Sequence, residues 1–155
     1  MRWSKLKSLV EEQFSTSLGK RISIFSTRYG NCTCGRAWIT LDGREIATFC
    51  TRAEYNVSIG ESKRENPPLG YGELSRQDAY ESCWAVVHDL SIEEALSDSD
   101  PLVQSLAVLD RRFGKRRMKV QDWANLHPLA QLLFSVRLQS EGMAIPVGLS
   151  QNVTT

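Results

Sequence analysis

The charged residues between Asp89 and Asp122 have the types and spacing that come closest to binding chemistry in this chain. Residues 89–100 carry five acids and no base, residues 101–109 carry no charge, and residues 110–122 carry six bases and two acids. Several cationic side chains on a short stretch can hold a phosphate backbone by charge. The pattern therefore gives a candidate nucleic-acid-binding set of Arg111, Arg112, Lys115, Arg116, Arg117 and Lys119.

Two other interpretations explain the same pattern without a phosphate ligand. Acids at the start of a helix and bases at its end complement the helix dipole, which accounts for the acids before Pro101 and the two arginines after Asp110. The dipole effect fades within a turn, so it accounts less well for the bases after Gly114. Alternatively, the acidic and basic blocks pair with each other across a symmetric dimer, because their charges are complementary.

No arrangement of residues identifies a catalytic site, and we assign no catalytic residue and no cofactor. The chain has two histidines, His88 and His127, and no recognisable motif places a serine or cysteine nucleophile beside either of them. The adjacent glutamates of the acidic block point apart on a helix and do not form an acid–base pair. Gly114-Lys115 does not belong to a phosphate-binding loop, because Arg116 stands where a serine or threonine must hold magnesium.

The four cysteines offer a metal-site hypothesis that we do not adopt. A hairpin that precedes Cys50 brings it toward Cys32 and Cys34, and a zinc ion would take its fourth ligand from Cys83 or His88. The Cys-x-Cys spacing, however, is a poor match to the spacing of zinc ligands. We therefore expect reduced thiols and no metal site.

Periodic apolar residues predict an amphipathic helix over about residues 5–18. Ser4 is expected to cap this helix, and Gly19 is expected to end it in a left-handed conformation. The apolar stripe of the helix consists of Leu6, Leu9, Val10 and Phe14.

The pattern then changes to alternation, which predicts three antiparallel strands over residues 21–27, 36–41 and 44–49. Asp42-Gly43 is typical of a two-residue type I′ turn, because both positions of that turn need a positive φ. The turn fixes a register in which Leu41 lies opposite Arg44. Extended along the strands, this register pairs Ile39 with Ile46, Trp38 with Ala47 and Gly35 with Cys50.

Capping residues predict where the helices of the second half begin. Ser75 and Ser91 each start a capping box, in which a side chain three residues later bonds back to the cap. Asp100, followed by proline, begins a helix that we expect to end at Gly114. Pro128 begins the last helix of the pattern.

The order of the elements indicates an α+β protein, with a small three-stranded antiparallel sheet packed by an N-terminal helix and followed by a mostly helical C-terminal half. We expect one domain over residues 1–142, made of a sheet-containing part (1–55), a loop (56–72) and a helical part (73–142). Residues 143–155 show no pattern and are expected to form a flexible tail.

Composition narrows the function classes. The chain has 155 residues, a formal net charge of +1 and 41% hydrophobic residues, which is typical of a globular protein. A net charge this small creates no overall electrostatic field that would attract nucleic acid or a membrane surface. The first ten residues lack the apolar run of a signal peptide, and no stretch approaches the length of a bilayer span. We therefore expect a cytoplasmic protein without a membrane partner.

Four segments spread along the chain resemble a family of small uncharacterised bacterial proteins. The resemblance covers most of the chain and implies a cytosolic bacterial protein. Because the family has no assigned activity, it supplies no catalytic residue. The segments are Trp3-Ser4-Lys5-Leu6-Lys7, Ser91-Ile92-Glu93-Glu94-Ala95-Leu96, Leu109-Asp110-Arg111-Arg112-Phe113-Gly114-Lys115-Arg116-Arg117 and His127-Pro128-Leu129.

Three functional hypotheses follow from the sequence. The first is a non-enzymatic domain that acts through contacts with a protein partner or as a homodimer. The second is a nucleic-acid-binding protein that uses the basic turn from Arg111 to Lys119, and a steep salt dependence of binding would favour it. The third is a small enzyme with scattered site residues, and a deep pocket that holds His88 or the cysteines would favour it.

Overall fold

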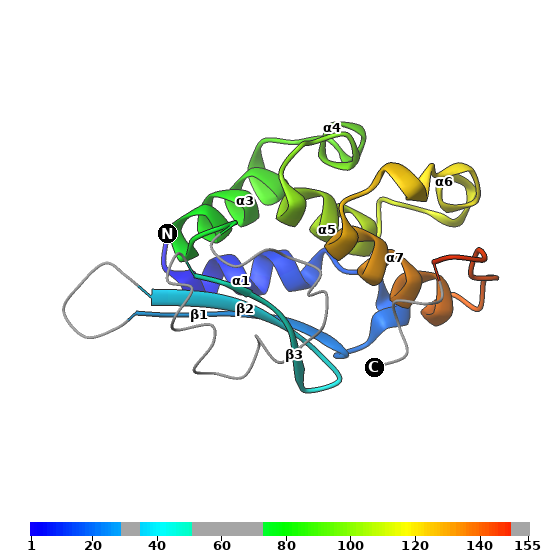
Figure 1. Ribbon diagram of the computed structural model, residues 1–155. Helices are drawn as coiled ribbons and strands as arrows, with labels where there is room; N and C mark the ends of the chain where they lie inside the picture. The colour runs from blue at the N-terminus through cyan, green and yellow to red at the C-terminus, as the bar shows by residue number, and fades with distance from the viewer. Residues whose placement is uncertain (29–34, 51–72, 150–155) are drawn as a thin grey trace.

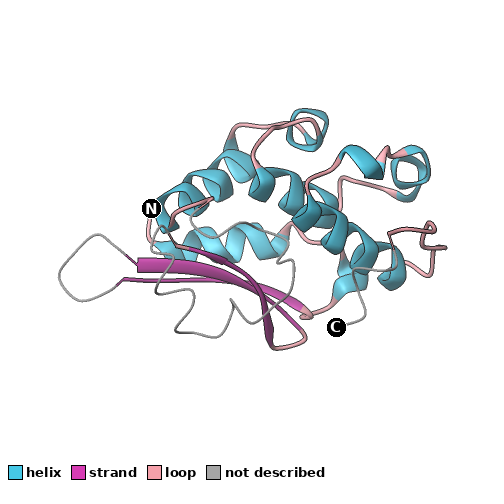
Figure 2. Cartoon of the chain, in the orientation of Figure 1, coloured by secondary structure: helices cyan, strands magenta, loops and turns pink. Residues whose placement is uncertain are grey.

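The computed structural model describes residues 1–28, 35–50 and 73–149 of the protein. A three-stranded sheet forms one side of the molecule, and the helices cover one of its faces, with α1 (Trp3–Glu12) between the sheet and the other helices (Figure 1). The strands lie together on one side of the molecule and the helices on the other (Figure 2). The predicted fold class, α+β with a helical C-terminal half, is confirmed.

The first helix is shorter than the sequence pattern suggests. It begins after Arg2 rather than Ser4, ends at Glu12, and buries Leu6 and Val10. The chain then leaves the helix because its backbone bonds to a distant turn: the N–H of Ser15 donates to the carbonyl of Leu109 at 2.8 Å. A 3₁₀ turn, η1 (Thr16–Leu18), follows, and Gly19 ends this turn rather than α1. Gly19 has the positive φ expected of it, 56°, but its ψ of −129° lies outside the left-handed helical region that was predicted.

The sheet has the order β1 (Ile22–Arg28), β2 (Gly35–Leu41) and β3 (Arg44–Phe49), and both pairs are antiparallel. The predicted turn is confirmed, since Asp42 and Gly43 have φ values of 52° and 81°. The pairing of Leu41 with Arg44 is confirmed as well.

Beyond the turn the predicted register is wrong. A bulge between Ile39 and Thr40 shifts the pairing by one residue, so that Ile39 lies opposite Ala47 instead of Ile46 and Trp38 lies opposite Thr48. The last pair is Ala37 with Phe49, so the register that was to place Cys50 opposite Gly35 does not hold. Cys32 and Cys34 lie outside the described residues.

The helical half begins with α3 (Arg76–His88), α4 (Ile92–Leu96) and α5 (Pro101–Leu109). All three start where the capping residues predict. Ser75 and Ser91 both form complete capping boxes, and the Asp100 carboxylate accepts hydrogen bonds from two backbone N–H groups of α5.

Gly114 does not end a helix, as its type suggested, but precedes one. Helix α5 already ends at Leu109, and Gly114 is the N-cap of α6 (Lys115–Val120). A short turn, η3 (Trp123–Asn125), and the last described helix, α7 (Pro128–Ser140), follow.

Helices α5 and α7 form the centre of the helical layer. Eight of the nine residues of α5 are buried. Residues 143–149, which the sequence pattern assigned to a flexible tail, lie against this core: Met143 and Ile145 are partly buried, and Leu149 is fully buried. Residues 150–155 lie outside the described part.

Candidate functional site

The six basic residues of the candidate set lie in two adjoining pieces of structure. Arg111 and Arg112 belong to the turn of residues 110–113 between α5 and α6, and the other four lie on α6, at one end of the molecule (Figure 1). All six side chains are exposed. The fold therefore keeps the set together.

Two of the six cations already have partners within the chain. Arg112 forms a two-pronged ion pair with Asp110, with an Nη2–Oδ2 distance of 2.8 Å, and Arg117 pairs with Glu93 of the acidic helix α4. The backbone N–H of Glu93 and then the Arg117 guanidinium lower the pKa of the Glu93 carboxyl. The acidic and basic blocks thus meet inside one chain.

The remaining four cations have no side-chain partner among the described residues. They are exposed and lie on α6 and in the turn before it, so they present a surface of uncompensated positive charge. This surface, called the basic face below, consists of Arg111, Lys115, Arg116 and Lys119.

A buried arginine holds the turn in place beneath this basic face. Arg137 of α7 is only 2% exposed, and its guanidinium donates to three backbone carbonyls of the turn region: Val108 at 3.1 Å, Asp110 at 2.8 Å and Phe113 at 2.7 Å. Its Nε donates to Glu141 at 2.9 Å. Each donor satisfies a buried carbonyl or carboxylate, which makes the turn costly to rearrange.

The Glu141 carboxylate extends this network to the N-terminal part of the chain. It accepts hydrogen bonds from the hydroxyls of Ser15 at 2.7 Å and Ser17 at 2.8 Å. Burial raises the pKa of Glu141, but the hydrogen bonds from the two serines and from Arg137 outweigh it and lower the pKa to about 2. The turn is therefore fixed from below by a charged network, and the basic face stands on a rigid support.

An apolar groove of about 480 Å³ adjoins α6. It lies between α6, η3, α7 and the segment that follows α7. Val120 lies in the sequence between two residues that line the groove, and it is 82% exposed. The residues that line the groove are Met118, Lys119, Gln121, Trp123, Phe134, Leu138, Met143, Ala144 and Pro146.

Sequence reasoning missed both the groove and the buried arginine. The groove is built from segments that are distant in sequence, and no motif joins them. Arg137 had a local signal, because it stands between Val136 and Leu138 in an apolar stripe and Glu141 follows it by four residues. That spacing is also typical of a surface ion pair, so it does not by itself indicate burial.

The histidines have structural roles in this fold. The Nδ1 of His127 accepts the backbone N–H of Leu129 at 3.1 Å and caps α7, so its Nε2–H points to Glu73, 3.0 Å away. His88 ends α3, and its ring lies 4.2 Å from the ring centre of Trp84. Neither contact pairs a histidine with a nucleophile.

Cys83 is fully buried on α3, and burial raises the pKa of its thiol to about 12, with a smaller contribution from the nearby Asp100 carboxylate. Such a thiol stays protonated and binds metal poorly. Within residues 1–28, 35–50 and 73–149, no group of three potential metal ligands is found, and no helix has the length and apolar character needed to cross a membrane.

A sequence model of the SF0329 protein family matches residues 2–138. The match includes all six residues of the candidate set and the buried Arg137. None of the curated proteins and none of the solved structures matches the chain.

Proposed function

The chain belongs to the SF0329 protein family, and from that premise we propose that it is a non-enzymatic protein-interaction domain that binds an acidic, apolar segment of a partner protein. One observation carries the proposal. The basic face and the apolar groove share helix α6, and Lys119 belongs to both of them.

The chemistry of this combined surface is that of a protein interface. Interfaces have an apolar centre surrounded by polar and charged residues, and they are enriched in aromatic residues, methionine and arginine. Here Met118, Trp123 and Phe134 line the groove. Lys119 of the basic face supplies a cation in the wall of the groove.

Charge complementarity indicates the partner. Uncompensated cations at the border of an apolar groove favour a segment that carries acidic residues beside bulky apolar ones. The Arg137 network holds the turn in one conformation before binding, which lowers the entropy cost of association.

A protein partner fits this surface better than a nucleic acid does. The Arg117–Glu93 ion pair links α6 to α4, and both Glu93 and Glu94 are exposed. A phosphate backbone that followed the basic face would meet these carboxylates, and like charges repel. A protein partner can place cations there.

The test is a selection of displayed random peptides on the immobilised protein. The site variant carries Lys115→Glu, Arg116→Glu and Lys119→Glu. The matched control carries Lys5→Glu, Lys20→Glu and Arg44→Glu, three exposed cations outside the basic face. We expect the selected peptides to combine acidic and bulky apolar residues, and to bind the control variant but not the site variant.

Three outcomes would overturn the proposal. One is a selection with no sequence preference, and another is equal peptide binding by the two variants. The third is salt-sensitive binding to mixed-sequence DNA or RNA that is lost when Lys115, Arg116 and Arg117 are replaced by alanine, which would make the protein a nucleic-acid binder. Analytical ultracentrifugation checks whether a second copy of the chain occupies the surface instead.

A further inference from the structure

One edge of the sheet is closed at Ile24 by two side chains of α1. The Nζ of Lys7 donates to the carbonyl of Ile24 at 2.7 Å, and the N–H of Ile24 donates to the Glu11 carboxylate at 3.1 Å. Lys7 and Glu11 also pair with each other at 2.6 Å. Both backbone groups of Ile24 therefore face away from β2, and both have partners. Charged side chains that cover an edge in this way keep another strand from pairing with it.

Further along β1 the same edge is open. In an antiparallel strand, the N–H and C=O of one residue point to one side and those of the next residue point to the other. Ser26 and Arg28 therefore turn both groups to the same side as Ile24, away from β2. Within the described part of the chain, no residue donates to or accepts from these groups on that side. Such groups are spaced to pair with a further strand.

The open stretch forms one wall of a hollow at the end of the molecule where the chain begins (Figure 1). The hollow has a volume of about 760 Å³, within the range of sites that enclose small molecules. An added strand lies only about 4.8 Å from its neighbour, so the hollow has room for a short stretch of one. The residues that line it are Met1, Arg2, Trp3, Ser26, Thr27, Arg28, Arg76, Gln77 and Tyr80.

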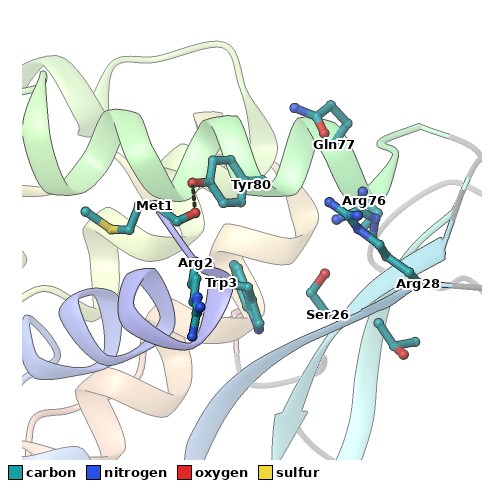
Figure 3. A pocket seen from close by; sticks show the side chains of 9 residues that line it. Met1, Arg2, Trp3, Ser26, Arg28, Arg76, Gln77 and Tyr80 are labelled. Atoms are coloured by element: carbon teal, nitrogen blue, oxygen red, sulfur yellow. Dashed lines mark hydrogen bonds between the residues drawn. The ribbon is translucent and has the colours of Figure 1, made fainter. Parts of the chain in front are cut away.

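Two aromatic side chains line the hollow beside this edge. Figure 3 shows Trp3 and Tyr80 on the helix side of the hollow and Ser26 on the strand side. The two rings have centroids 6.5 Å apart and are tilted by 47°. The Tyr80 hydroxyl donates to the carbonyl of Met1 at 2.7 Å, which holds this ring in place. Side chains of a strand alternate between the two faces of a sheet, so every second residue of an added strand would point toward these rings.

From these observations we infer that the edge of β1 at Ser26 and Arg28 binds a short extended segment of another protein as an added strand. Backbone hydrogen bonds hold the segment, and one of its bulky apolar side chains packs on Trp3 and Tyr80. Because Ile24 is closed, the open edge is short, which suits a flexible segment better than the edge of a second folded sheet. This site is separate from the basic face, and it stands whether or not the partner of that face exists.

The first test needs no partner. Amide hydrogen exchange, followed by NMR in the unbound protein, should be slow at Ile24, which is bonded to Glu11, and at Thr27, which faces β2. It should be fast at Ser26, which faces the hollow. Equal protection at Ser26 and Thr27 would show that the edge is already paired, and would overturn the inference.

The second test selects displayed random peptides on the protein that carries Lys115→Glu, Arg116→Glu and Lys119→Glu, so that the basic face does not capture them. We expect the selected peptides to share a bulky apolar residue and to need no acidic one. A bound peptide should slow exchange at Ser26 and leave it unchanged at Thr27. N-methylation of the peptide should weaken binding about 10-fold or more at alternate positions only, because only every second N–H faces β1.

Two substitutions of one residue locate the contact. Ser26→Pro removes the outward N–H, a change that an edge strand tolerates, and should weaken peptide binding about 10-fold or more. Ser26→Ala removes the same hydroxyl but keeps the N–H, and should bind like the protein with Ser26. Circular dichroism checks that both variants fold. The N-methylated peptides keep the test decisive if Ser26→Pro unfolds, because they leave the protein unchanged.

The inference is overturned if no selected peptide binds in a saturable way, if N-methylation has no alternating effect, or if Ser26→Pro and Ser26→Ala bind alike. It is also overturned if the peptide becomes helical on binding. A dimer in analytical ultracentrifugation that Ser26→Pro abolishes would overturn it as well, because the edge would then join two copies of the chain. None of these outcomes bears on the proposed function, whose surface is already disabled in the selection.

Discussion

Replacing Glu141 with glutamine should destabilise the protein by about 3 kcal/mol at neutral pH. The folded carboxyl has a pKa of about 2 instead of its ordinary 4.5, and this difference corresponds to about 3 kcal/mol of stability when the group is charged. Removing one partner of a buried ion pair costs about 3–5 kcal/mol, and the 14% exposure of the Glu141 side chain places the value at the lower end.

The pH dependence tests the same reasoning independently. The folded state lowers the pKa of the Glu141 carboxyl, so the stabilisation is fully present above pH 4.5. It is lost as the pH falls from 4.5 toward 2. The glutamine side chain does not titrate. The variant's free energy of unfolding should therefore fall below that of the unchanged protein by the whole difference at neutral pH. At about pH 3 the deficit should be less than half as large.

Urea unfolding at the two pH values measures both quantities. The matched control is Glu12→Gln, an exposed glutamate of α1 with no side-chain partner among the described residues. It should stay within about 0.5 kcal/mol of the unchanged protein. A Glu141→Gln variant as stable as this control, or a deficit that does not vary with pH, would show that the carboxylate does not neutralise Arg137.

Three further predictions concern local features. Asp100→Ala removes the cap of α5 and should cost about 1–2 kcal/mol in thermal unfolding; an unchanged melting temperature would mean that α5 does not depend on this cap. Gly43→Val forces a branched side chain to a φ of 81° and should cost about 1–3 kcal/mol by the same assay; a cost near zero would contradict the turn. Cys83, with a pKa raised to about 12 by burial, should resist iodoacetamide in the folded protein and react after unfolding in urea. Peptide mass spectrometry locates the label, and labelling of Cys83 in the folded protein would refute its burial.

Features set by neighbouring residues could be predicted from the sequence. The caps at Ser75, Ser91 and Asp100 and the Asp42-Gly43 turn all depend on bonds or φ values within a few residues. The α+β class followed from these features and from the apolar periodicity. In each case the local preference and the tertiary structure agree.

Features set by tertiary packing could not be predicted. The bulge near Ile39 places one extra residue in β3, and nothing in the alternation of that strand marks it. Likewise, Gly114 is compatible with the end of one helix or the start of another, and the choice depends on how the turn packs.

The candidate sites show the same division. The basic residues of α6 were visible in the sequence as a cluster because they are neighbours. Trp3, Ser26 and Tyr80 share no motif, since three elements bring them to one hollow only in the folded chain. The apolar neighbours of Arg137 can be read from the sequence, but its three carbonyl partners cannot.

The hydrogen bond between Ser15 and Glu141 has a consequence for how the protein is made. It joins residues 126 positions apart, a stretch that a ribosome needs roughly 6–25 s to translate. Once α5 and the turn have been translated, and until α7 follows, the carbonyl groups of the turn lack the guanidinium of Arg137 and the apolar side chains of α5 have no α7 to cover them. We therefore expect the nascent chain to complete this domain only after residue 141 has emerged, and to need protection from aggregation until then.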